Sequence, residues 1–368
     1  MTLNDLDTPS FIVDVDKLER NLRRMQDIAK RAGVRLRPHT KTHKSPYIAK
    51  MQVNLGAGGI TVAKLSEALV MADAGFDDIL ITCPVYGAAK WEKIPALLDK
   101  AQVTFNLDSL EVAEGLNAVG EKIGKRLRVY LEVDCGMGRC GMPADERVLP
   151  YAEAVARMKG LELVGILTWG GQAYRARTPE ERKHWGGLEG ETGVRVAQMV
   201  RAHLGLPVPE VSIGCTPSAE FSAFVEGVTE IRPGSYVFGE INHIGTGCVT
   251  PQECSATVLT TIFSRPRPDH ALCDAGSKSL IAEPSHWDDY PGYGYVLDHH
   301  PHVIVHRLNE EHGWLKVSGA SQGLKIGDRL RIIPNHTCPT VNLYDEMVLC
   351  RGEEVLQTIP VAARGKVQ

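Results

Sequence analysis

The sequence predicts a (β/α)8 barrel, the TIM-barrel architecture of α/β proteins, followed by a C-terminal antiparallel β domain. Two observations carry this prediction. Short apolar runs alternate with amphipathic helical stretches over about the first 240 residues, and closely spaced strand-like runs replace that alternation afterwards. A doubly wound sheet is the alternative for alternating elements, but no GxGxxG motif follows the first predicted strand. We therefore expect a barrel over residues 1–248 and a β domain over residues 249–368.

The expected barrel strands are short apolar runs bounded by polar or glycine-containing segments. They are residues 10–13, 34–36, 59–62, 79–82, 103–105, 129–133, 163–167 and 211–213. Helical stretches lie between them. In the first stretch Leu18, Leu22, Met25 and Ile28 recur at helical spacing, which places them on one face of a helix.

Beyond residue 250 the helical periodicity is absent, and Pro and Gly separate strand-like runs. These runs are residues 256–259, 303–305, 314–317, 330–333 and 347–350. Such close spacing without intervening helices is typical of a compact antiparallel β domain.

Composition limits the classes of binding partner and the cellular compartment that we expect. The 368 residues are 43% hydrophobic, enough to bury a large core. A net charge of −4 argues against a nucleic-acid or anionic-membrane partner. No long apolar run predicts a membrane helix, and the acidic N-terminus lacks the features of a secretion signal. Nine cysteines without regular spacing fit reduced thiols, so we expect a cytoplasmic protein.

The strongest indication of chemistry is residues 37–44, RPHTKTHK, which follow the second predicted strand. Active-site groups of a (β/α)8 barrel lie at the C-terminal ends of its strands. Lys41, flanked by His39, suits an amine that forms a Schiff base with an aldehyde cofactor such as pyridoxal phosphate. Positive charge from Arg37 and Lys44 would favour the neutral, nucleophilic amine. The octapeptide alone also fits a solvated basic loop.

Four further predicted strand ends carry glycines and polar groups. Residues 132–141, EVDCGMGRCG, place Arg139 to meet an anionic oxygen, and residues 168–174, TWGGQAY, contribute Gln172 and Tyr174. In two later loops, glycine and hydroxyl residues can form a phosphate cradle, because backbone N–H groups and hydroxyls converge there. The candidate phosphate residues are Gly214, Thr216, Gly234, Ser235 and Tyr236.

A candidate metal pair lies in residues 333–342, IPNHTCPTVN. In extended backbone His336 and Cys338 would point to the same side, so an imidazole and a thiolate could share one ion. Nitrogen and sulfur ligands favour zinc or a similar borderline ion. Two protein ligands leave positions for water or substrate, as in catalytic sites. A turn with a buried cysteine and an incidental histidine is the alternative.

Taken together, these segments resemble the fold-type III pyridoxal-phosphate enzymes, and more narrowly the D-threonine aldolase and D-serine dehydratase family, over nearly the whole chain. The resemblance implies that Lys41 is the Schiff-base lysine. It also implies that Arg139, in a glycine motif similar to that of alanine racemase, meets the cofactor's ring hydroxyl. We expect Lys41, His39 and Arg139 to be catalytic, and the resemblance implies a metal site at His336 and Cys338.

The resemblance implies a pyridoxal-phosphate- and metal-dependent lyase acting on D-configured β-hydroxy-α-amino acids. We favour D-threonine aldolase-type cleavage to glycine and an aldehyde. Dehydration of D-serine or D-3-hydroxyaspartate is the alternative, and an amino-acid racemase or a non-catalytic cofactor-binding protein is a weaker one. The His-x-Cys pair resembles the dehydratases, whereas Trp169 and residues 172–174 resemble the aldolases.

Two further expectations rest on the same resemblance. The expected ion is zinc, with manganese or magnesium as alternatives. Relatives that combine a barrel with a β domain lead us to expect a homodimer with a small-molecule D-amino acid substrate.

Overall fold

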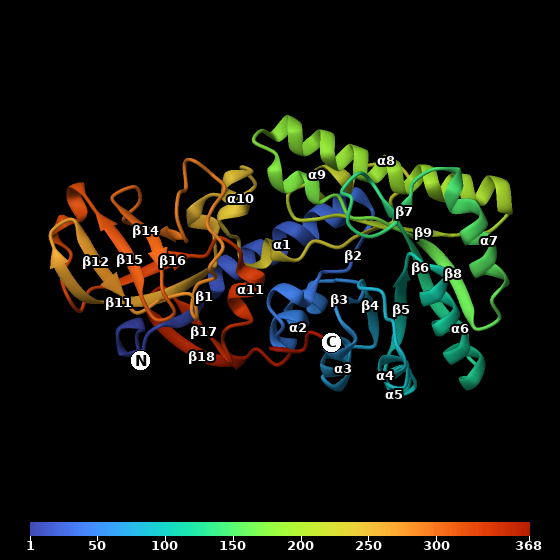
Figure 1. Cartoon of the computed structure of the whole chain (residues 1–368), viewed down its shortest axis with the longest axis horizontal. Coiled ribbons are helices and arrows are strands. Elements are labelled where there is room, and N and C mark those ends of the chain that lie inside the picture. Colours follow the sequence, from blue (N-terminus) through green and yellow to red (C-terminus); the bar gives the residue numbers. More distant parts are fainter. The chain divides into compact units, whose positions relative to one another are not determined.

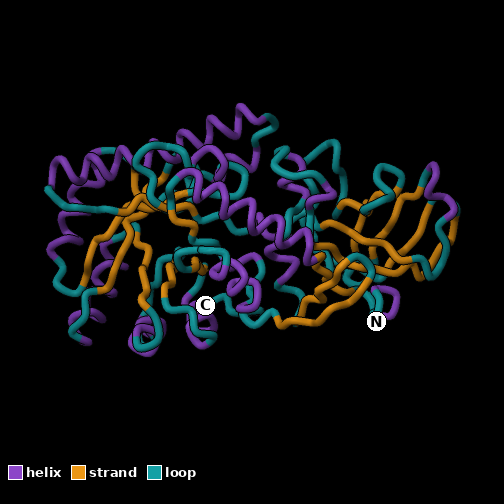
Figure 2. The backbone as a smooth tube through the Cα atoms, turned by 180° about the vertical axis from the view of Figure 1, so that it is seen from behind, coloured by secondary structure: helices purple, strands orange, loops and turns teal.

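The computed structural model describes residues 1–368 and divides them into two compact units, whose elements are labelled in Figure 1 and coloured by type in Figure 2. We call them the barrel unit and the β unit. The barrel unit comprises Arg24–Lys41, Pro46–Gly234 and Gly365–Gln368. The β unit comprises Met1–Arg23, Thr42–Ser45 and Ser235–Arg364.

The barrel unit is built on eight parallel strands. In chain order they are β2 (Arg35–Leu36), β3 (Ile60–Val62), β4 (Asp78–Ile81), β5 (Gln102–Leu107), β6 (Leu127–Asp134), β8 (Leu161–Leu167), β9 (Glu210–Ile213) and β10 (Glu230–Ile231). The sheet order is β2-β10-β9-β8-β6-β5-β4-β3, and the two-residue β7 (Met142–Pro143) pairs with β6. A parallel bridge between His39 and Thr61 joins the two ends of this order, so the sheet closes on itself.

Helices follow or precede most of the barrel strands. They are α1 (Val15–Ala32), α2 (Pro46–Asn54), α3 (Leu65–Asp73), α4 (Ala88–Trp91), α5 (Ile94–Leu98), α6 (Leu110–Ile123), α7 (Leu149–Arg157), α8 (Pro179–Leu204) and α9 (Ala219–Ser222). The predicted apolar face of α1, residues Leu18, Leu22, Met25 and Ile28, is buried, which confirms that prediction. No helix of the structure combines the length and the apolar character needed to cross a membrane.

The β unit holds a nine-stranded sheet. Its strands are β1 (Ser10–Asp14), β11 (Ala256–Arg267), β12 (His270–Cys273), β13 (Tyr295–Val296), β14 (Val303–Leu308), β15 (Gly313–Val317), β16 (Arg329–Ile333), β17 (Glu346–Arg351) and β18 (Glu354–Pro360). The order is β12-β15-β14-β13-β16-β11-β1-β17-β18, and β12 also pairs with β11. That extra pairing closes six strands into an antiparallel barrel. Two short helices, α10 (Ile241–Gly245) and α11 (Thr337–Val341), complete the unit.

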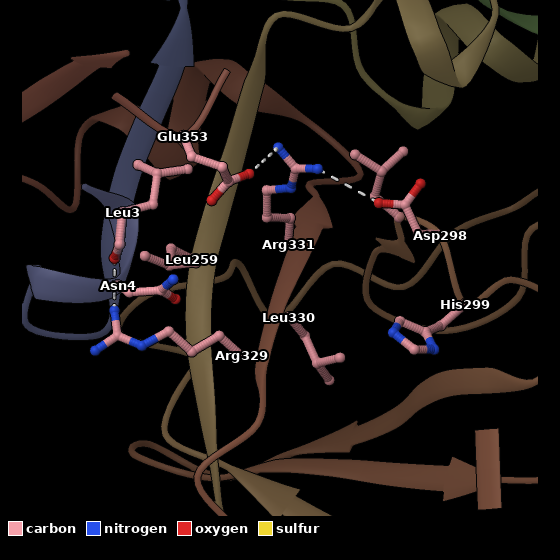
Figure 3. Close-up of a pocket in the computed structure, with 10 residues that line it drawn as sticks. Leu3, Asn4, Leu259, Asp298, His299, Arg329, Leu330, Arg331 and Glu353 are labelled. Carbon is pink, nitrogen blue, oxygen red and sulfur yellow. Dashed lines mark hydrogen bonds and ion pairs between the residues drawn. The ribbon is translucent and has the colours of Figure 1, made fainter. Parts of the chain in front are cut away.

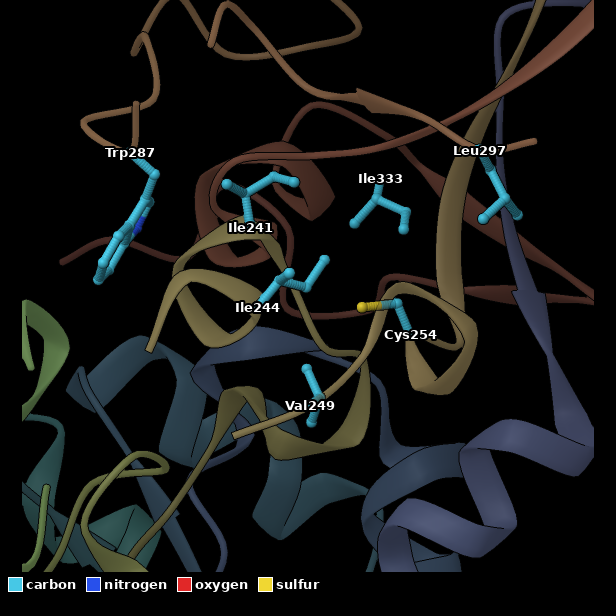
Figure 4. Packing of buried hydrophobic residues seen from close by; sticks show 7 residues of the cluster. All are labelled: Ile241, Ile244, Val249, Cys254, Trp287, Leu297 and Ile333. Carbon is cyan, nitrogen blue, oxygen red and sulfur yellow. The ribbon is translucent and has the colours of Figure 1, made fainter. Parts of the chain in front are cut away.

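A hydrophobic cluster anchors α10 within the β unit (Figure 4). It comprises Ile241, Ile244, Val249, Cys254, Trp287, Leu297 and Ile333. Gly245 ends α10 against the indole ring, and a Cβ at this position would lie 2.2 Å from Trp287. Because a side chain at residue 245 would displace the indole, glycine is required there.

One predicted strand belongs to a different sheet from the one we expected. Residues 10–13 do form a strand, but β1 pairs with β11 and β17 in the β unit, so its assignment to the barrel is wrong. The eighth barrel strand is instead the two-residue β10. A short apolar run buried on both faces looks the same in either sheet, because burial alone does not identify the neighbouring strands. In the middle of the chain, the division between the two units falls between Gly234 and Ser235.

Candidate active site at the strand ends

Lys41 lies in the 3-10 turn η2 (Thr40–Thr42), which follows β2. Within residues 37–44 it is partly exposed, whereas the other seven residues are buried. The backbone N–H of Lys41 donates to His39 Nδ1 at 3.4 Å, and His39 Nε2 lies 3.3 Å from the hydroxyl of Thr82, just after β4. The solvated-loop alternative is therefore wrong, and the turn presents one amine from an otherwise buried segment.

The expected electrostatic role of Arg37 is also wrong. Its guanidinium donates to Glu230 at 2.7 Å and to Asp78 at 2.6 Å, so its charge is neutralised. These carboxylates begin β10 and β4, whereas Lys41 follows the C-terminal end of β2. The ammonium of Lys44 donates to the backbone oxygen of Ala363 at 3.3 Å. Arg37 therefore balances buried charge at the other end of the barrel.

Arg139 lies in the glycine-rich loop after β6. Asp134 at the end of β6 fixes the loop, because its Oδ1 accepts the backbone N–H groups of Gly136 at 2.9 Å and Met137 at 2.7 Å. The Arg139 guanidinium lies 4.1 Å from the ring centroid of Trp169 and 3.8 Å from Glu132. Its side chain remains 50% exposed, so it can still meet an anionic group. The Asp–x–Gly pattern indicated this turn, although sequence reasoning had not used Asp134.

Gln172 and Tyr174 lie in the 3-10 turn η4 (Gly171–Arg175), after β8. Gln172 Nε2 donates to the backbone oxygen of Cys135 at 3.2 Å, which links this loop to the loop after β6. The amide oxygen of Gln172 is buried without a hydrogen-bond partner. A bound group with a donor would satisfy that oxygen.

The loop after β9 carries Gly214 and the buried Thr216. Gly214 has φ +105°, a conformation that favours glycine. Its N–H donates at 2.9 Å to Oε1 of Glu189, a buried carboxylate on α8 that sequence reasoning missed. Gly234 follows β10 and is the last residue of the long barrel segment.

Ser235 and Tyr236 continue the chain into the β unit, in the 3-10 turn η5 (Ser235–Val237). Both are buried. The Ser235 hydroxyl lies 3.0 Å from Nε2 of His243 on α10. This partner fixes the orientation of the serine, which could not be deduced from the Gly-Ser-Tyr motif.

His336 and Cys338 meet at the start of α11, in a different backbone conformation from the one expected. His336 is extended at the N-cap of the helix, but Cys338 is already in the first helical turn, so the prediction of two extended residues is wrong. Cys338 nevertheless contributes to raising the pKa of His336. The thiol of Cys338 also lies 3.2 Å from the hydroxyl of Thr42, the residue that follows Lys41.

Carboxylates give the surroundings of His336 a negative character. Glu240 is buried and accepts the N–H and hydroxyl of Thr337, both at 2.7 Å, while Glu283 lies 3.8 Å from His336 Nδ1. Burial opposes protonation of the imidazole, but Glu240, Cys338 and Glu283 outweigh it and raise the pKa of His336 to about 10. The carboxylates that favour the protonated imidazole would also favour a bound cation, which would have to displace the imidazole proton.

The donor set at α11 fits a divalent ion with an open coordination shell. No group of three or more His, Cys, Asp or Glu side chains is arranged to hold a metal ion. His336 and Cys338 are the candidate protein ligands that the sequence predicts here. Nitrogen and sulfur donors favour zinc or a similar ion, and a shell with few protein ligands leaves room for substrate oxygens.

A pocket of about 200 Å³ in the β unit is separate from these residues (Figure 3). Arg331 extends between Asp298 at 3.4 Å and Glu353 at 3.9 Å. Arg329 donates to the backbone oxygens of Leu3 and Leu6, both at 2.8 Å. Because its charged groups are partnered within the protein, this pocket is not the candidate site.

Comparison with known proteins covers nearly the whole chain. Residues 13–242 match the family model described as alanine racemase, N-terminal domain, and residues 255–350 match the putative serine dehydratase domain. The chain is 35% identical to D-threonine aldolase of Arthrobacter sp. over 98% of this chain and 93% of that protein. It is 34% identical to D-threo-3-hydroxyaspartate dehydratase of Delftia sp. (strain HT23), over 92% and 93% respectively.

One solved structure is similar to this chain in both fold and sequence. The crystal structure of D-threonine aldolase from Filomicrobium marinum covers 100% of this chain and 98% of its own, with a TM-score of 0.93 and 32% identity. This agreement confirms the predicted combination of a TIM-like barrel with a C-terminal β domain.

Proposed function

This chain belongs to the D-threonine aldolase and D-serine dehydratase family of lyases, and from that premise we propose that it cleaves D-configured β-hydroxy-α-amino acids into glycine and an aldehyde. The family implies pyridoxal phosphate, and a divalent ion is part of the proposal. The 3.2 Å contact between Thr42 and Cys338 carries the proposal, because Thr42 directly follows Lys41. Thr42 and Cys338 both belong to the β unit, so the contact ties the ligand pair to the segment that continues the lysine motif.

The residues at the strand ends suit pyridoxal phosphate. Lys41 supplies an amine for the aldehyde, and the half-exposed Arg139 suits the ring oxygen. When bound, the cofactor supplies an electron sink for negative charge at Cα. The remaining residues proposed to bind it are His39, Gln172, Tyr174, Gly214, Thr216, Gly234, Ser235 and Tyr236.

His336 and Cys338 are proposed to hold the divalent ion, for which zinc suits the donor set best and manganese or magnesium are alternatives. When bound, such an ion supplies a Lewis acid that lowers the pKa of a hydroxyl. Thr42 restrains the Cys338 thiol through its hydroxyl, and Glu240 fixes the start of α11 through Thr337. These contacts would keep the ligand pair facing one point.

Lys41 is proposed to move the proton at Cα. In aldol cleavage the bond between Cα and Cβ breaks as the β-hydroxyl loses its proton, and Lys41 returns a proton to Cα of the glycine formed. In dehydration Lys41 would instead remove the Cα proton, and the β-hydroxyl would leave. One amine can serve both reactions, since it would give a proton to Cα in cleavage and remove one in dehydration, although the bonds that break differ.

Dehydration to a keto acid and ammonia is the second candidate. The observation that favours it is the sulfur ligand: the His336–Cys338 pair resembles the pair of the dehydratases. The 34% identity to a D-threo-3-hydroxyaspartate dehydratase supports it to the same extent as the aldolase relatives support cleavage.

Product analysis with D-threonine tests the proposal. Purified protein should release glycine and acetaldehyde, and a chelator should abolish the reaction until zinc or manganese is restored. L-Threonine is the matched control and should not react. Release of 2-oxobutanoate and ammonia would establish the dehydratase instead, and turnover of neither D-threonine nor D-serine would overturn the proposal.

We also propose a cytoplasmic homodimer. The nine cysteines are all free thiols in the structure, which supports a reducing compartment. Dimerisation rests on the resemblance to other enzymes with a barrel and a β domain. Sedimentation equilibrium of the purified protein should give twice the 40.3 kDa chain mass.

A further inference from the structure

We propose that Glu189 is a positioning residue that holds the loops after β8 and β9 in the arrangement needed to bind the cofactor's phosphate. The inference rests on the proposed function, since the phosphate in question is that of pyridoxal phosphate. Glu189 itself would not touch the cofactor. It would act through the backbone of the two loops.

The contacts of Glu189 connect three points of the barrel unit. Its Oε1 accepts the backbone N–H of Gly170 at 2.8 Å and that of Gly214 at 2.9 Å. Its Oε2 accepts the hydroxyl of Ser218 at 3.0 Å. Gly170 lies in the loop after β8, whereas Gly214 and Ser218 lie in the loop after β9. One carboxylate on α8 therefore joins two loops that are more than forty positions apart in the sequence.

The pairing between β8 and β9 does not reach the glycines that Glu189 contacts, so a side chain is needed to join the two loops. The paired register of β8 and β9 ends at Leu167 and Ser212, before Gly170 and Gly214 are reached. The carboxylate continues the link beyond the paired residues. The thiol of Cys215 donates to the backbone oxygen of Gly170 at 3.4 Å, which adds a second link between the same loops.

A buried carboxylate at this place is costly unless it has partners. Glu189 is 1% exposed, and burial raises its pKa, while the N–H groups of Gly170 and Gly214 oppose that rise. Arg232, also buried, adds favourable charge and donates to the hydroxyl of Ser212 at 2.8 Å. Glu189 and Arg232, which carry opposite charges, thus support the ends of three neighbouring strands, β8, β9 and β10.

The contact also redefines the role of Gly214. Its N–H is already donated to Glu189, so Gly214 contributes its left-handed conformation, φ +105°, to the loop. The donors for a phosphate would then come from the residues that follow, including the hydroxyl of Thr216. Because the loop after β8 carries Gln172 and Tyr174, a shift of either loop would alter the cofactor site.

The decisive experiment compares two cofactor forms on the full-length chain after its cofactor has been removed. Pyridoxal phosphate and pyridoxal differ only in the phosphate, and their dissociation constants can be measured by absorbance titration. Glu189→Leu should weaken pyridoxal phosphate binding by about tenfold to a hundredfold, whereas pyridoxal affinity should change by less than about threefold. Glu189→Gln should rescue part of the loss, because its amide oxygen can still accept both N–H groups.

Glu191→Gln is the matched control, since Glu191 lies on the same helix and is exposed. Equal losses for both cofactor forms in the Glu189 variants would overturn the inference and leave Glu189 a purely structural residue. If Glu189→Leu does not fold, the ratio of the two affinities in Glu189→Gln decides, and an unchanged ratio overturns the inference. Failure of the wild-type chain to bind pyridoxal phosphate would instead overturn the proposed function.

Discussion

The two ends of the barrel strands use charge in opposite ways. At the N-terminal end, Arg35 and Arg37 both donate to Glu230, at 2.6 and 2.7 Å, and Arg37 also reaches Asp78. Burial works against ionisation of Glu230, but the two arginines outweigh it and lower its pKa. At the C-terminal end, Lys41 and Arg139 remain partly exposed.

The difference between the two ends shows that residues of one charged segment can have separate structural and functional roles. Arg37 and Lys41 belong to the same octapeptide, yet one completes a buried ion network and the other follows the strand and is partly exposed. A charge that is paired inside the protein stabilises the fold only when its partners are present. A charge that the fold leaves available can act on a ligand. The predictions below test whether this division holds.

The largest effect should follow removal of the Lys41 amine. Lys41→Ala should lower kcat/KM for the D-amino acid substrate by about 10³-fold or more, because both the covalent attachment point and the proton carrier are lost. Its free energy of unfolding should stay close to that of the wild type. Steady-state kinetics and urea denaturation measure the two quantities, and wild-type turnover by Lys41→Ala would remove the lysine from the mechanism.

Breaking the ion network of Arg35, Arg37 and Glu230 should have the opposite effect: it should lower stability and leave cofactor binding unchanged. Glu230→Ala should destabilise the protein by about 3–5 kcal/mol, because it removes the buried carboxylate shared by Arg35 and Arg37 and leaves Arg37 only Asp78 as a partner. The fraction that remains folded should bind pyridoxal phosphate with wild-type affinity. Urea denaturation monitors the loss, with the exposed Glu191→Ala as control. A stable Glu230→Ala protein with impaired cofactor binding would contradict the division between the two ends.

The ligand pair at α11 should separate metal binding from cofactor binding. Cys338→Ser should lower zinc affinity and activity together, each by about tenfold or more, since a weaker oxygen donor replaces the thiolate. The visible absorbance of the bound cofactor should persist. Cys338→Asp should shift the preference towards manganese, because a carboxylate is a harder donor. Full activity of the chelated wild-type enzyme would rule out the metal and favour a metal-independent enzyme.

The smallest effect is expected at Arg139. Arg139→Gln should weaken cofactor binding by about 1.5 kcal/mol, the lower end of the range for a hydrogen bond to a charged group, because the side chain is half exposed. Its free energy of unfolding should change by less than about 0.5 kcal/mol, since the side chain is half exposed and lies 3.8 Å from Glu132. Absorbance titration and urea denaturation give both numbers. A large loss of stability would place Arg139 with the structural charges.

Local patterns were enough to predict most of the elements. The spacing of Leu18, Leu22 and Met25 identified α1, and the position of Lys41 after a short apolar run identified it as the candidate nucleophile. What failed was the assignment of residues 10–13 to the barrel, because the pattern of a buried strand carries no information about its neighbours. The two-residue β10 is too short for any periodicity to be detected.

Contacts between distant segments were beyond the reach of sequence reasoning. The contact between Thr42 and Cys338 spans 296 positions, and Glu189 reaches Gly214 across 25. Neither spacing corresponds to a turn, a helix face or a strand. Glu189 lies on a helix among other acidic residues, so only its burial in the folded chain distinguishes it from the exposed Glu191.

Borohydride reduction followed by peptide mapping tests the central claim most directly. The claim is that the strand-end lysine, among the lysines of this chain, carries the cofactor. Reduction of the purified enzyme should remove its visible absorbance and leave pyridoxal phosphate attached to the peptide that contains Lys41. Attachment at Lys44 or Lys278 instead would contradict the account.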